Sequence, residues 1–116
     1  MTDGQLGRDG ERAAVEFLRR RGLTLVETNL RVGRDELDAV FLDGTELVVV
    51  EVKTRSTGMM GRGLESVTPA KLHRMRRGIA GWLARQVEFY GDVRFDVVEV
   101  APVGGELAVE WFRDVA

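Results

Sequence analysis

Two apolar runs that flank the dipeptide Asp43-Gly44 constrain the fold of this chain more than any other feature. The runs cover residues 36–42 and 45–53, and Asp-Gly between runs of this kind is a strong signal of a β-hairpin. Apolar side chains occupy both faces of the two predicted strands along most of their length. Strands of this kind are covered on both sides by other elements, which predicts a layered α/β structure.

The hairpin also predicts a register. With that dipeptide as a two-residue turn, Leu42 pairs with Thr45. The same register places Glu36 opposite Glu51, and side-chain alternation then brings three acids and one lysine to one end of one sheet face. The four charged residues are Glu36, Asp38, Glu51 and Lys53.

The rest of the chain fits a single small domain, residues 1–116. The apolar periodicity predicts a helix over 5–21, and Thr68-Pro69 has the capping hydroxyl and proline that begin a second helix. The other predicted strands are 23–29, 93–101 and 106–112. The order αβββαββ indicates a mixed central β-sheet flanked by helices.

Composition excludes several kinds of chemistry. The chain has no cysteine and one histidine, which excludes disulfides, thiolate zinc sites and cysteine nucleophiles and argues against a Ser-His site. No apolar run approaches the ~20 residues of a membrane span, and the charged start is unlike a secretory signal. We therefore expect a cytoplasmic protein whose reactive groups are carboxylates and lysine.

The net charge of −2 conceals an uneven distribution. Basic residues exceed acidic ones before residue 86, and residues 69–85 contain five basic side chains and no acid. A patch of one sign attracts phosphate more effectively than total charge suggests, although a solvated helix face explains the same pattern.

The acids at the end of the hairpin have two interpretations. They lie at a water-exposed sheet edge with Lys53 as counter-ion, or they bind a divalent cation, which prefers several carboxylate oxygens in one place. Glu11 favours the cation, because it lies on the flank of the first helix's apolar stripe and can reach the rim of the sheet. As a single observation, Glu11 is better explained as one more surface charge of the helix.

Glu11, Asp38 and the tripeptide Glu51-Val52-Lys53 together resemble the PD-(D/E)xK nuclease superfamily, in particular its Holliday-junction-resolvase-like branch. The chain is more closely similar to the bacterial YraN family of predicted endonucleases. The matching stretches are GRDGERAAVEFL (7–18), NLR (29–31), ELDAV (36–40), LVVVEVKTR (47–55), VTPAKLHR (67–74) and RFDVVEV (94–100). One departure is Asp35, which stands where the family usually has glycine.

The resemblance implies a restriction-endonuclease-like fold and metal-dependent hydrolysis of DNA with Mg²⁺ or Mn²⁺. It implies that Asp38 and Glu51 are metal ligands, with the Val52 carbonyl as a third. Lys53 would orient or help to deprotonate the attacking water, and Glu11 would complete the site. Glu36 matches the first acid of the family's Glu-x-Asp and is a further candidate ligand.

Basic residues near this site would then contact the DNA backbone, which positions a duplex without reading its sequence. They are Arg31, Arg34, Arg55, Arg62, Lys71, Arg74 and Arg77. Superfamily analogy favours branched or recombination intermediates as substrates, and a homodimer would supply two active sites for two strands. The alternatives are a catalytically inactive nucleic-acid-binding module of the same fold, and a protein-interaction domain, which the acidic end of the chain favours.

Overall fold

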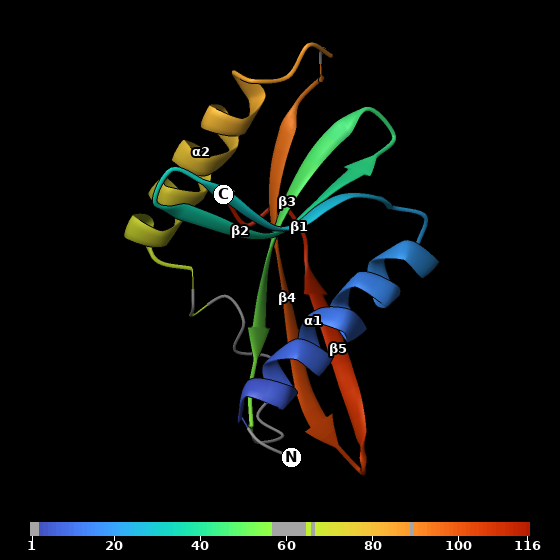
Figure 1. The fold of residues 1–116 in the computed structure, drawn as a ribbon. Helices are drawn as coiled ribbons and strands as arrows, with labels where there is room; N and C mark the ends of the chain where they lie inside the picture. Colours follow the sequence, from blue (N-terminus) through green and yellow to red (C-terminus); the bar gives the residue numbers. More distant parts are fainter. Residues whose placement is uncertain (1–2, 57–64, 66, 89) are drawn as a thin grey trace.

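The computed structural model describes residues 3–56, 65, 67–88 and 90–116 as five strands and two helices (Figure 1). They follow the chain as α1 (Asp3–Arg20), β1 (Thr24–Val32), β2 (Asp35–Asp43), β3 (Glu46–Thr54), α2 (Pro69–Leu83), β4 (Val93–Val103) and β5 (Glu106–Phe112). The sheet order is β1-β2-β3-β4-β5, in which only β3 and β4 run parallel. The predicted order αβββαββ and the mixed sheet are confirmed, and the architecture is that of a restriction-endonuclease-like fold.

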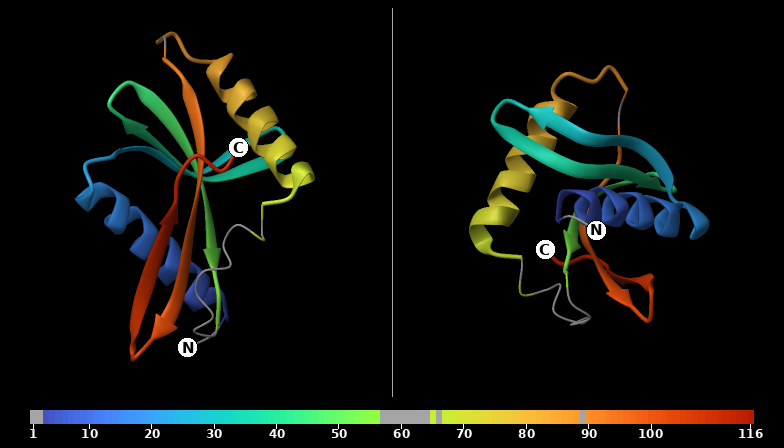
Figure 2. Two further views of the ribbon diagram at one scale, coloured as in Figure 1. Left: turned by 180° about the vertical axis from the view of Figure 1, so that it is seen from behind. Right: turned by 60° about the horizontal axis from the view of Figure 1, so that its bottom comes forward.

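The two helices cover opposite faces of the sheet (Figures 1 and 2). Helix α1 packs on β3, β4 and β5, where Leu18 meets Val50 and Val98 in one buried cluster. Helix α2 packs on β2 and β1, where Ile79 and Val49 belong to a second cluster. Both faces of β3 are therefore buried, as its continuous apolar sequence predicts.

The predicted register of the β2–β3 hairpin is wrong by two residues. Asp43 pairs with Glu46, and Leu42 pairs with Leu47 rather than with Thr45. The physical reason is that Gly44, whose φ is 64°, begins the turn while Asp43 remains in the strand. A shift by an even number of residues leaves each side chain on its face.

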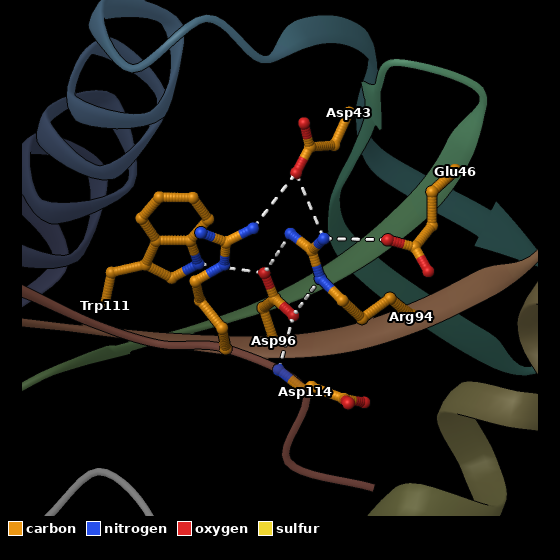
Figure 3. A network of polar contacts seen from close by, with 7 residues as sticks. Asp43, Glu46, Arg94, Asp96, Trp111 and Asp114 are labelled. Atoms are coloured by element: carbon orange, nitrogen blue, oxygen red, sulfur yellow. Dashed lines mark hydrogen bonds and ion pairs between the residues drawn. The ribbon is translucent and has the colours of Figure 1, made fainter.

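An ionic network centred on Asp96 lies beside the turn of this hairpin (Figure 3). Asp96 is fully buried and accepts two hydrogen bonds from Arg94, each 2.9 Å long. Its carboxylate also accepts hydrogen bonds from Trp111 Nε1 at 2.8 Å and from the Asp114 backbone N–H at 2.9 Å. Four donors satisfy the charge that burial would otherwise penalise.

Arg94 connects this network to the β2–β3 hairpin. Its Nη1 donates to Asp43 at 3.0 Å and to Glu46 at 2.8 Å, which are the residues on either side of the turn. The hydrogen bonds from Arg94 to Asp96 raise the pKa of Arg94 above its ordinary value, and Asp43 and Glu46 act in the same direction. The network therefore fixes the hairpin against β4.

Neither α1 nor α2, the helices of the described part of the chain, combines the length and the apolar character that a membrane crossing requires.

Candidate active site

Strands β2 and β3 separate beyond their last pair, Ala39 with Val50, and Asp38 lies at the point of separation. The Val52 backbone N–H donates a hydrogen bond of 2.9 Å to Asp38 Oδ2. The carboxylate thus satisfies a donor that the strand ladder leaves open. The corrected register brings Asp38, rather than Glu36, beside Glu51. Asp38 comes directly before Ala39 and Glu51 directly after Val50, so the two acids adjoin the last pair of the antiparallel strands.

Glu51 forms an ion pair with Lys71 across the boundary between β3 and α2. Lys71 Nζ lies 2.9 Å from Glu51 Oε1, and their side chains are 28% and 16% exposed. Helix α2 begins as predicted, since the Thr68 hydroxyl accepts a hydrogen bond from the Lys71 backbone N–H at 3.1 Å and Pro69 opens the first turn. The cap therefore fixes the backbone from which Lys71 reaches the sheet.

The electrostatics of Asp38 are strongly perturbed. Burial raises the pKa of Asp38 to about 7 from 3.8, and the negative charges of Glu51 and Glu11 act in the same direction. The Val52 N–H and the Lys71 ammonium oppose this increase. Acids brought together in this way favour either a shared proton or a bound cation.

Glu11 reaches the site from the other side of the sheet. It lines a cavity of about 360 Å³ together with Asp38, Val52 and Asn29. Asn29 has a left-handed backbone, with φ 49°, which is uncommon for a residue other than glycine.

Gly10 explains how α1 comes close enough to place Glu11. A Cβ atom at Gly10 would lie 2.3 Å from Thr54 Oγ1 and 2.9 Å from Thr54 Cγ2. Only glycine permits this approach of the helix to β3 without displacement.

A second cavity, of about 150 Å³, lies on the α2 side of Asp38. Its lining combines the acids of the site with basic residues, and Arg34 and Arg74 are among them. The residues that line it are Arg34, Asp35, Glu36, Asp38, Glu51, Lys71, Arg74 and Met75. Three of the predicted DNA-binding residues therefore surround the acids.

Lys53 lies two residues after Glu51, so strand alternation places it on the same face of β3. Its register partner in β4 is Glu99, a fully buried carboxylate. Arg55 Nε donates a hydrogen bond of 2.6 Å to Glu99 Oε2. Arg55, a predicted DNA contact, is thus engaged with an acid next to the predicted catalytic lysine.

The other predicted residues have varied surroundings. Arg31 and Glu36 form a solvent-exposed ion pair of 3.2 Å with each other. Arg77 donates through Nε and Nη2 to both oxygens of Asp35, at 2.8 and 2.7 Å. Arg62 lies outside the described residues.

Asp35, the residue that departs from the pattern of the resemblance, is paired with Arg77. The hydrogen bond from Arg77 holds the pKa of Asp35 below its ordinary value. Because the Asp35 residue is buried, this bidentate pair fastens the start of β2 to α2.

The candidate ligands of this site are oxygen atoms, which Mg²⁺ and Mn²⁺ prefer. Among the residues that the structure describes, no group of three or more acidic or histidine side chains is arranged to hold a metal. Magnesium, however, uses one or two carboxylates and retains several waters. The carboxylates of Asp38 and Glu51 match that smaller requirement in their chemistry, and Glu11 lines a cavity together with Asp38.

Sequence reasoning did not anticipate the pairing of Lys71 with Glu51, nor the buried carboxylates of Asp96 and Glu99. Nothing in the sequence around Lys71 indicated a pairing with Glu51, because that pairing depends on how α2 docks on the sheet. Asp96 and Glu99 did carry one, since they interrupt the apolar run 93–101 of a predicted inner strand.

The fold and this arrangement of acids and lysine define a class. A five-stranded mixed sheet between two helices, with Asp38 and Glu51-Val52-Lys53 on adjacent strands, has the organisation of a PD-(D/E)xK-type protein. The sequence model described as "Uncharacterised protein family UPF0102" matches residues 10–100. The chain belongs to the UPF0102 family.

Relatives match over most of their length as well as over most of this chain. The "UPF0102 protein" of Beutenbergia cavernae is 46% identical over 111 residues, which cover 95% of this chain and 94% of the relative. The "UPF0102 protein RSal33209_1090" of Renibacterium salmoninarum is 40% identical over 113 residues, or 97% and 96% of the two chains. The "UPF0102 protein YraN" of Salmonella arizonae is 40% identical over 116 residues, covering 98% of this chain and 86% of the relative.

Proposed function

We propose that this protein is a metal-dependent nuclease that hydrolyses phosphodiester bonds in DNA. The observation that carries the proposal is the meeting of Asp38 and Glu51 where β2 and β3 separate, with Lys53 on the same strand as Glu51. Carboxylates and lysine in this arrangement are suited to metal-assisted hydrolysis of a phosphodiester.

Asp38, Glu51 and the Val52 carbonyl would hold Mg²⁺ or Mn²⁺. When bound, the ion supplies activation of water and neutralisation of charge on the phosphate. The Val52 N–H orients Asp38, and Glu11 adds a carboxylate on the α1 side of the site. Lys53 would orient the attacking water as an ammonium group or accept its proton as a neutral amine. Lysine suits these roles better than arginine, because burial shifts the pKa of an amine more readily than that of a guanidinium.

The substrate is approached by basic residues around the smaller cavity. Arg34 and Arg74 line it, and their position supports contacts with phosphates on either side of the scissile bond. Such contacts favour recognition of DNA shape over sequence, so branched or recombination intermediates are the substrates that we propose. A homodimer would place two such sites on two strands.

A second function, binding of nucleic acid without hydrolysis, is favoured by one observation. Glu51 is engaged by Lys71, and the described residues hold no cluster of three acids arranged for a metal. A module of this kind would keep the basic surface and lose the reaction.

The experiment that separates the two functions compares linear, flapped and four-way-junction DNA in Mg²⁺, Mn²⁺ and EDTA. The variant is Glu51→Gln, and Glu88→Gln, which alters an exposed acid beyond α2, is the matched control. The nuclease predicts metal-dependent cutting by the wild type and the control, and none by Glu51→Gln. Binding that is equal in all three proteins, without any product, would establish the binding module instead.

A further inference from the structure

The proposed reaction gives no role to the ion pair between Lys71 and Glu51. The chain has two lysines, Lys53 and Lys71, and Lys71 lies among the acids rather than on the outer face of α2. Its ammonium is 2.9 Å from Glu51 Oε1, and Lys71 lines the cavity of about 150 Å³ together with Asp38 and Glu51. One cation of this chain thus acts on both carboxylates.

The position of Lys71 is held from both directions along the helix. The Thr68 cap fixes its backbone N–H, and Met75, one turn further on, is buried against the sheet. The backbone at Lys71 is thus fixed, whereas a four-carbon stem can place its ammonium in several positions. Lys71 and Glu51 line one cavity together with Arg34 and Arg74, so the space into which the ammonium can move adjoins its present position.

We propose that Lys71 substitutes for the metal in the metal-free site, and that it moves to a phosphate oxygen of the substrate when a divalent cation binds. The inference rests on the proposed function. A divalent ion on Asp38 and Glu51 repels an ammonium held by the same carboxylates, because like charges at a few ångströms destabilise each other. The released ammonium then joins the basic side chains that face the DNA backbone.

This exchange gives Lys71, as a positioning residue, opposite effects on two affinities: it weakens metal binding and strengthens DNA binding. In the absence of DNA it competes with the metal, so its removal strengthens metal binding. In the presence of DNA it supplies one phosphate contact, so its removal weakens DNA binding and lowers its dependence on salt. A lysine that only stabilised the fold would produce neither effect.

The test measures Mn²⁺ binding to the free protein by electron paramagnetic resonance, for the wild type, Lys71→Met and Lys71→Gln. Arg85→Met is the matched control, because it removes one positive charge from just beyond the C-terminal end of α2. We expect Mn²⁺ to bind roughly tenfold more tightly to both Lys71 variants, and equally to the wild type and the control. Thermal unfolding of each variant establishes that it is folded.

A second measurement follows DNA binding in Ca²⁺ over a range of salt concentrations. We expect Lys71→Met to reduce the slope of log affinity against log salt by about one, which corresponds to one lost phosphate contact. Unchanged Mn²⁺ affinity in the Lys71 variants, with Mn²⁺ bound by the wild type, would overturn the role of Lys71 and leave the proposed nuclease intact. Failure of Mn²⁺ to bind to the wild type and to all variants would overturn both.

Discussion

The perturbed carboxyl of Asp38 makes the stability of this protein depend on pH in an unusual direction. Its pKa is about 7 in the folded protein and 3.8 for the ordinary group, so the folded state holds the proton over a range in which the unfolded state has lost it. Stability from this group is fully present below about pH 4 and is lost as pH rises through 7. A difference of roughly three pKa units corresponds to a loss on the order of 4 kcal/mol in the absence of metal.

Asp38→Asn isolates this effect, because asparagine does not ionise and its carbonyl oxygen can still accept the hydrogen bond from the Val52 N–H. We expect the variant to be more stable than the wild type at pH 8 by up to a few kcal/mol. At pH 4 the two proteins should be nearly equal in free energy of unfolding. Urea denaturation in EDTA between pH 4 and pH 9 measures the difference.

Asp92→Asn, which changes an exposed aspartate before β4, is the control and should track the wild type at every pH. A stability difference between Asp38→Asn and the wild type that does not grow with pH would refute the electrostatic account of the site. So would an Asp38→Asn protein that is less stable than the wild type at pH 8.

Three further predictions concern the support of the site and its substrate. Asp96→Ala leaves Arg94 buried with a principal partner removed, and urea denaturation should show a loss of about 3–5 kcal/mol; a loss below 1 kcal/mol would contradict the role of the network. Gly10→Ala should destabilise the protein by about 1–3 kcal/mol, and Thr54→Ala should restore part of that loss in the double variant, which a double-mutant cycle measures. Arg74→Met should weaken binding of all DNA sequences alike and reduce the salt slope by about one, whereas a sequence-dependent loss would show that Arg74 reads bases.

The fold was predictable because local signals agreed with one another. The two-sided apolar pattern of β3 required cover on both faces, and α1 and α2 provide it. The register was predicted wrongly because the dipeptide Asp-Gly indicates a turn but does not determine whether Asp or Gly is its first residue. Because the error was two residues, the predicted sheet face of each side chain was correct, and Asp38 and Glu51 still lie at the same end of the hairpin.

The site was predictable only in part. Asp38 and Glu51 lie on adjacent strands, so their neighbourhood follows from pairing that the sequence encodes locally. The contacts of Lys71 with Glu51 and of Arg77 with Asp35 depend instead on the docking of α2, which no short motif specifies. For this reason Lys71 and Arg77, which were predicted to contact DNA, form ion pairs with acids of the protein itself.

The central claim, that this site hydrolyses DNA, is tested most directly by cutting a four-way junction in ¹⁸O-labelled water with Mn²⁺. The account predicts that each cut leaves one DNA end with a phosphate that carries one ¹⁸O atom and one end with an unlabelled hydroxyl. It also predicts no product in EDTA and a rate at least roughly a hundredfold lower for Asp38→Asn. Product that forms equally with Asp38→Asn, or no product from any DNA in Mn²⁺ or Mg²⁺, would contradict it.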